Sequence, residues 1–121
     1  MRPTLHILRM PRVDAKRMLY IEETLLRHDP AKRNFLCFNR SLPHHRAVIL
    51  GISGKPRELV NVDNAENDEI PLIKRFTGGG TVFVDDNVKF TSLIMNKTAL
   101  PDVKPYPHDI MKFTELIYKY V

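Results

Sequence analysis

Three consecutive glycines, Gly78 to Gly80, constrain the fold of this chain more than any other feature. They separate two segments, 72–76 and 81–85, whose β-branched and aromatic residues are typical of strands. A run of three glycines is costly to order, because glycine loses more conformational freedom on folding than any other residue. Such a turn allows a ligand to approach the backbone closely and lets amide N–H groups converge on an anion. We therefore expect a strand, a glycine turn and a second strand here.

An arginine, Arg75, stands just before this turn. Its fixed, planar guanidinium suits a carboxylate or a phosphate. The residues alone fit two interpretations equally well, an anion cradle and a tight hairpin with a surface arginine. Other phosphate loops fit less well: no G-x-G-x-x-G is present, and the Gly-Lys pair at 54–55 is followed by Pro56 instead of Ser or Thr.

The spacing of the apolar residues predicts a mixture of helices and strands. A helix is expected over 15–28, with Asp14 as its N-cap and the Asp-Pro pair at 29–30 as its stop. The segment 63–69, with four acidic residues in seven positions, is expected to be a solvated loop. Strands are expected at 35–38, 47–52, 72–76, 81–85 and 88–95.

A last helix is expected over 109–121, after three prolines at 101, 105 and 107. No Gly, Asn or Pro ends this helix, which suggests a chain cut inside a larger fold. An apolar helix face needs a surface to cover. The apolar residues of that face are Ile110, Phe113, Leu116, Ile117, Tyr120 and Val121.

The length and charge limit the classes of protein. A chain of 121 residues is enough for one domain, and no apolar run approaches the roughly 18 residues of a membrane span. The net charge is +5: residues 1–50 carry ten basic and four acidic side chains, and residues 51–121 carry nine and ten. A solvated basic face or an acidic partner is favoured over a nucleic acid, because the basic half has no RNA-binding signature. We expect neither a nucleic-acid partner nor a membrane, and the cytoplasm as compartment, with the mitochondrion or plastid as second choice.

Other candidate catalytic groups give weak signals. Cys37 is flanked by apolar residues, so a buried, unreactive thiol is expected. The single cysteine excludes a disulfide framework. The His44-His45 pair lies in a polar loop and is expected to be exposed. Neither a metal site nor a Ser–His–Asp set can be derived from the spacing.

The segment from Lys74 to Asp85 resembles the motif R-R-x-[ST]-G-G-G-x-V-[FI]-H-D of lipoate–protein ligase A and the wider biotin/lipoate ligase family. Two further segments follow the family order. Tyr20 to Leu26, with its paired glutamates, resembles the first family helix, and Val48 to Pro56 resembles the strand and loop V-V-x-G-x-x-x-x-P. The resemblance covers about residues 15–96, and 109–121 would be the next family helix.

This resemblance implies an α/β fold with a mixed β-sheet flanked by helices, related to class II synthetases. It also implies that the chain is one partial catalytic domain. Residues 1–13 would be a basic N-terminal extension, 14–97 the family-like core, and 98–121 a proline linker and terminal helix.

The resemblance implies a two-step chemistry. ATP, with Mg²⁺, would activate lipoate or a related acyl group to acyl-AMP, and the acyl group would pass to a lysine of a carrier domain. Such carriers belong to 2-oxoacid dehydrogenases or to the glycine cleavage system. No metal-binding residue is assigned in this chain.

The resemblance also assigns roles within the motif. Arg75 would hold the acyl-adenylate, and Thr77 with Gly78, Gly79 and Gly80 would line the pocket. Phe83 would pack the acyl chain or its neighbours. Val84 stands where bacterial members carry histidine, so a hydrogen-bond donor is lost while an apolar wall remains.

No lysine of this chain stands in the context of the family's adenylation lysine, which lies in a later strand. The chain is therefore expected to be inactive alone, and no catalytic residue is assigned. Three alternatives stay open: a non-catalytic isoform or split subunit that binds acyl-adenylate or a partner chain, an octanoyl or lipoyl transferase, and a basic nucleic-acid-binding module.

Overall fold

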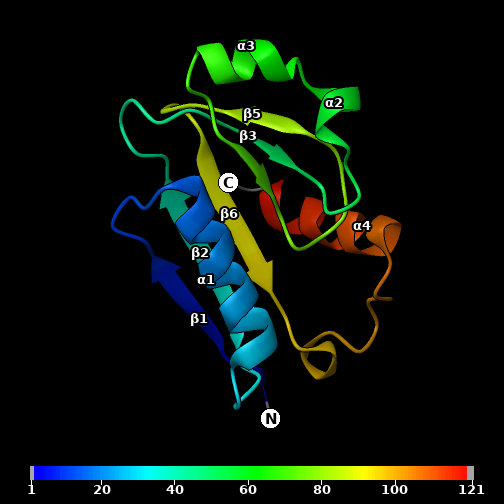
Figure 1. Ribbon diagram of the computed structural model, residues 1–121. Helices are drawn as coiled ribbons and strands as arrows, with labels where there is room; N and C mark the ends of the chain where they lie inside the picture. Colours follow the sequence, from blue (N-terminus) through cyan, green and yellow to red (C-terminus); the bar gives the residue numbers. More distant parts are fainter. Residues whose placement is uncertain (1, 120–121) are drawn as a thin grey trace.

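The computed structural model of the protein describes residues 2–119 (Figure 1). Within this range the strands form two three-stranded sheets. The first sheet has the order β1 (Leu5–Arg9), β2 (Asn34–Arg40), β6 (Lys89–Ile94), with β1 parallel and β6 antiparallel to β2. This architecture confirms the expected α/β class with mixed sheets and flanking helices.

The second sheet has the order β4 (Leu72–Lys74), β3 (Ala47–Leu50), β5 (Val82–Val84). Strand β4 runs parallel to β3, and β5 runs antiparallel to it. Two short helices, α2 (Pro56–Leu59) and α3 (Val62–Asn67), lie beyond this sheet at the top of Figure 1. Pro56 occupies the first turn of α2, a position that suits its fixed backbone angle.

Helix α1 (Ala15–His28) joins the two sheets, and its bounds agree with the prediction. Asp14 caps the helix, because its carboxylate accepts a hydrogen bond of 2.9 Å from the Arg17 amide. Met18 is fully buried against the first sheet, while Leu19 packs on the second. Phe90 of β6 contacts both apolar clusters, so the core is continuous.

Strand β1 was not predicted from the sequence. It lies inside the basic segment 1–13 and pairs in parallel with β2 along five residues. Leu5 and Ile7 remain 42% and 57% exposed, because β1 is an edge strand. An edge strand with a half-exposed apolar face leaves a weak pattern, which explains the omission.

The prediction of a solvated loop at 63–69 is wrong, because α3 occupies most of it. Asn61 caps this helix and accepts a hydrogen bond of 3.1 Å from the Asn64 amide. Asp63 lies in the first turn, where a negative charge is favourable. Ala65, in the middle of this helix, is buried. The prediction relied on the acidic residues and overlooked the buried Ala65 and the capping Asn61, which together suffice for a short helix.

The last helix, α4 (Pro107–Tyr118), is confirmed and begins two residues earlier than expected, because Pro107 suits the first turn. None of its described side chains is buried, and Leu116 is 65% exposed. Phe113 and Ile117 are half-buried. Tyr120 and Val121, expected on the same face, lie outside the described residues. In residues 2–119, no helix combines the length and the apolar character of a membrane span.

Candidate functional site

The glycine segment crosses the end of β3 instead of forming a hairpin. Strands β4 and β5 are not neighbours, since β3 lies between them. The Arg75 amide donates to the Leu50 carbonyl at 2.9 Å, and the Ile52 amide donates to the Thr77 carbonyl at 2.9 Å. The hairpin interpretation is therefore wrong, and the turn passes over the carboxyl end of the central strand.

The crossing depends on Gly51, which follows β3. A Cβ atom on Gly51 would collide with the carbonyl oxygen of Gly79. Gly79 itself has φ +119°, a conformation that residues with a side chain rarely adopt. By contrast, a Cβ on Gly78 or Gly80 would meet no heavy atom within 4 Å. Two glycines are thus required by the backbone, and two leave open space beside it.

The Arg75 guanidinium lies against the glycine turn. Its Nη2 donates to the Gly80 carbonyl at 2.8 Å, and a side chain on Gly79 would collide with the same nitrogen. Its Nε is buried and has no hydrogen-bond partner among the described residues. A buried N–H without a partner is costly in a folded protein, so this nitrogen calls for an explanation.

Glu22 of α1 lies near this arginine. It is half-buried and accepts a hydrogen bond from the Ser92 hydroxyl of β6. Burial raises the pKa of Glu22, while the Ser92 hydrogen bond and the charge of Arg75 act in the opposite direction. An acidic group thus stands close to the Arg75 cation.

Cys37 is fully buried and pairs with Ser92 across β2 and β6. Burial raises the pKa of this thiol, and the negative charge of Glu22 acts in the same direction. The expected burial of this thiol is confirmed, and its low reactivity stays a prediction. His44 and His45 are both exposed, as expected. In residues 2–119, no group of three or more His, Cys, Asp or Glu side chains could hold a metal ion.

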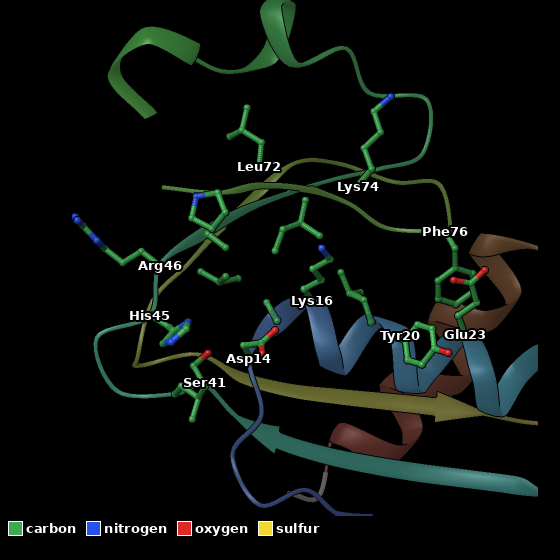
Figure 2. A pocket seen from close by; sticks show the side chains of 17 residues that line it. Asp14, Lys16, Tyr20, Glu23, Ser41, His45, Arg46, Leu72, Lys74 and Phe76 are labelled. Carbon is green, nitrogen blue, oxygen red and sulfur yellow. The ribbon is translucent and has the colours of Figure 1, made fainter. Parts of the chain in front are cut away.

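A first cleft of about 540 Å³ lies between α1 and the second sheet (Figure 2). Leu19, Ala47 and Val84 contribute apolar wall. Five charged side chains line this cleft, and all are labelled in Figure 2: Asp14, Lys16, Glu23, Arg46 and Lys74.

A second cleft of about 430 Å³ lies between α1, β6 and α4. Its polar groups include Glu22, Ser92 and Thr77, the last of which belongs to the glycine motif. Its other walls are mostly apolar and include Leu26, Leu93, Ile94, Val103, Ile110 and Phe113. The second cleft therefore combines mostly apolar walls with polar groups from α1, β6 and the glycine motif, and Arg75 is not among its lining residues.

The site residues predicted from the sequence lie in different parts of the structure. Thr77 lies in the wall of the second cleft, and Val84 is buried in the wall of the first. Phe83 is 53% exposed on β5 and belongs to the wall of neither cleft. Gly78, Gly79 and Gly80 form the exposed turn beside Arg75.

Sequence reasoning gave no role to Glu22, Ser92 or Phe76. A signal existed for Glu22, because it follows Met18 by four positions and therefore lies on the buried face of α1. An acidic residue on a buried face calls for an explanation. No comparable signal marked Ser92, whose meeting with Glu22 depends on the packing of α1 over β6.

A family model, the lipoyl protein ligase A/B catalytic domain, matches residues 14–121. The chain therefore belongs to the lipoyl protein ligase A/B catalytic domain family. A curated relative, the inactive lipoate–protein ligase 2 of Plasmodium falciparum, is 36% identical over 101 residues. That match covers 83% of this chain and 24% of the relative, so the chain spans about a quarter of the relative's length.

Solved structures agree with this family. A lipoate protein ligase of Thermoplasma acidophilum with bound lipoic acid is 29% identical, with a TM-score of 0.62, over 77% of this chain and 37% of its own. A lipoate–protein ligase A bound with ATP is 29% identical, with a TM-score of 0.61, over 77% of this chain and 36% of its own. A bipartite ligase from T. acidophilum, described with its E2 lipoyl domain, is 30% identical, with a TM-score of 0.55, over 70% and 32%. The chain thus corresponds to about a third of these structures.

Proposed function

We propose that this chain carries the acyl- and adenylate-binding part of a lipoate–protein ligase site. The observation that carries the proposal is the buried Nε of Arg75, which has no partner among the described residues and lies beside the glycine turn. A guanidinium held by one carbonyl, with a further donor available, suits the carboxylate of lipoate or the phosphate of its adenylate. Thr77 and the glycines Gly78 to Gly80 would line the same place.

The acyl chain would occupy the second cleft. Its volume of about 430 Å³ lies within the range of small-molecule sites. Its mostly apolar wall suits an alkyl chain, and its polar groups include Thr77, two positions after Arg75, and Glu22, on whose pKa the charge of Arg75 acts. In this arrangement Val84 supports the fold beside the first cleft, and Phe83 stands outside the acyl pocket.

The proposed reaction has two steps. The lipoate carboxylate attacks the α-phosphate of ATP, a C–O–P bond forms, and pyrophosphate leaves. The amine of a carrier lysine then attacks the acyl carbon, an amide forms, and AMP leaves. Arg75 would orient the carboxylate and then the adenylate phosphate, with ATP and Mg²⁺ entering as substrates. Relatives bound to lipoic acid and to ATP, and a ligase described together with its E2 lipoyl domain, support these substrates and this kind of carrier.

Isothermal titration of the chain with lipoate and with a non-hydrolysable lipoyl-AMP analogue tests the proposal. The Arg75→Gln variant should bind at least about tenfold more weakly, because a hydrogen bond to a charged group contributes about 1.5–3 kcal/mol. The matched control is Arg57→Gln, since Arg57 is exposed on α2 and remote from the motif in sequence. Equal affinity of the Arg75 variant and the wild type, or no binding by the wild type, would contradict the proposal.

A second candidate is a binding protein without ligase chemistry. Two observations favour it: the P. falciparum relative is named inactive, and α4 leaves apolar side chains such as Leu116 exposed. Lipoate-dependent exchange of pyrophosphate into ATP tests the second candidate. Exchange by this chain would exclude a binding protein without ligase chemistry, whereas ligand binding without exchange agrees with that candidate and also with a ligase part that lacks the adenylation lysine. A cysteine-dependent acyl transferase gains no support, because Cys37 is fully buried.

A further inference from the structure

The first sheet has one face that packs against α1 and one face that points away from it. Helix α1 lies over the sheet in Figure 1, and its Met18 packs against Phe35 and Cys37 of β2. Successive residues of a strand point to opposite sides of a sheet, so Leu36 and Phe38 point away from α1. The side of the first sheet opposite α1 is called the outer face below.

Strand pairing arranges the side chains of the outer face in four rows. In order along β2, the rows are Leu5 with Asn34, Ile7 with Leu36 and Leu93, Arg9 with Phe38 and Thr91, and Arg40 with Lys89. Leu5, Ile7 and Phe38 are exposed large apolar residues. An apolar patch on one face of one sheet, rimmed by polar residues, is typical of an interaction surface.

The charge on the outer face is basic. Its three cations, Arg9, Arg40 and Lys89, are exposed and stand at one end of the apolar patch. The three strands contain no Asp or Glu, and within residues 2–119 none of the three cations pairs with a carboxylate. The Arg9 guanidinium lies over the Phe38 ring, 5.9 Å from its centroid, which favours a position at the edge of the patch.

The dimensions of the outer face match those of one helix. Neighbouring strands lie about 4.8 Å apart, so three strands span about 10 Å between the outer two. An α-helix with its side chains is about 10–12 Å wide. Strand β2, with seven residues, is about 23 Å long, which corresponds to a helix of about 15 residues. Packing of a helix on each face of a sheet is a common layer arrangement.

From these observations we infer that the outer face binds an amphipathic α-helix of another protein. The apolar stripe of this helix covers the patch of Leu5, Ile7 and Phe38, and acidic residues at one of its ends lie over the three cations. A symmetric pair of copies of this chain is disfavoured, because the cations of one copy would face those of the other. Cations at one end of the patch also suit a rod with one acidic end better than the uniform surface of an anionic membrane.

This inference goes beyond the proposed function and does not depend on it. Among the residues in the four rows, Leu93 alone lines one of the two clefts. Arg75 and the glycine turn lie outside the first sheet. The helix could therefore bind whether or not the chain binds lipoate.

The test is fluorescence anisotropy of two labelled helical peptides titrated with the full chain. Both peptides are about 15 residues long and share one leucine stripe. One peptide carries glutamates at one end, and the other carries lysines at the same positions. The glutamate peptide should bind about tenfold more tightly, because the three cations attract one peptide and repel the other. The difference should shrink as salt is added, since exposed charges are screened.

Three variants test whether the peptide occupies the outer face. Ile7→Ser should weaken binding of the glutamate peptide about fivefold, because Ile7 is 57% exposed and would lose apolar contact with the peptide. The matched control is Leu59→Ser, since Leu59 is 54% exposed on α2 and should leave the affinity unchanged. Arg40→Glu should weaken the glutamate peptide and strengthen the lysine peptide, opposite changes that misfolding does not produce.

The outcomes decide between the occupants. Preference for the glutamate peptide that depends on Ile7 and Arg40, and not on Leu59, supports the helix. Equal binding of both peptides to the wild type, or binding that Ile7→Ser leaves unchanged, overturns it. Tighter binding to phosphatidylserine vesicles, lost in Ile7→Ser, would assign the outer face to a membrane. Self-association in sedimentation, lost in the same variant, would assign it to a second copy, and either result also overturns the inference.

Discussion

Replacing Gly51 by alanine should destabilise the protein, because the added Cβ atom would collide with the carbonyl oxygen of Gly79. Neither partner can move cheaply. The collision is with backbone, and the Ile52 amide and the Thr77 carbonyl hold the crossing together at 2.9 Å. Forcing one carbon into a packed site costs about 1–3 kcal/mol.

The size of the effect follows from the chain length. A domain of 121 residues loses about 4 °C of melting temperature per kcal/mol, so Gly51→Ala should lower the melting temperature by about 4–12 °C. Gly78→Ala is the matched control for stability, since its Cβ would meet no heavy atom within 4 Å. Thermal unfolding followed by circular dichroism measures both. Equal melting temperatures of the two variants would refute the crossing of the glycine turn over β3.

Three further predictions concern titrating groups. Arg33 lowers the pKa of Asp29 to about 2, below the unfolded value near 3.9. The stability that ionised Asp29 contributes to the folded protein is therefore present above about pH 4 and is lost as the pH falls toward 2. Asp29→Asn should abolish this dependence in melting curves. Burial raises the pKa of Glu22 in the folded protein. The contribution of Glu22 to the free energy of unfolding is therefore fully present below its pKa in the unfolded chain and is lost as the pH rises through its pKa in the folded protein. Glu22→Gln should therefore gain stability relative to the wild type between acid and neutral pH. Cys37 should not react with a thiol reagent before unfolding, and rapid labelling in the native protein would contradict its burial.

The fold could be predicted where local patterns are strong. The Asp14 cap and the Asp-Pro pair at 29–30 were sufficient for the bounds of α1, and the apolar runs marked β2, β3 and β6. The order of the strands could not be predicted, because the placement of β3 between β4 and β5 depends on contacts distant in sequence. The hairpin interpretation of the glycine turn failed for this reason.

The candidate site, like the fold, could be predicted from the sequence only in part. Arg75 and the glycines could be singled out from residue type and spacing alone. Their arrangement could not be predicted. The position of the Arg75 Nε, which has no partner within residues 2–119, depends on where the turn passes β3, and the Glu22–Ser92 contact depends on α1 packing over β6. Phe76 carried no sequence signal, because its contribution to the walls of both clefts exists only in the folded chain.

The central claim is that the Arg75 guanidinium binds the ligand carboxylate through its Nε. Nuclear magnetic resonance of the arginine side chains, recorded while lipoate is added, measures this directly. The account predicts a saturable downfield shift of the Arg75 Nε proton and slower exchange with water, together with shifts of the amides of Gly78 to Gly80. Saturable binding of lipoate that leaves the Arg75 Nε signal unchanged would contradict it.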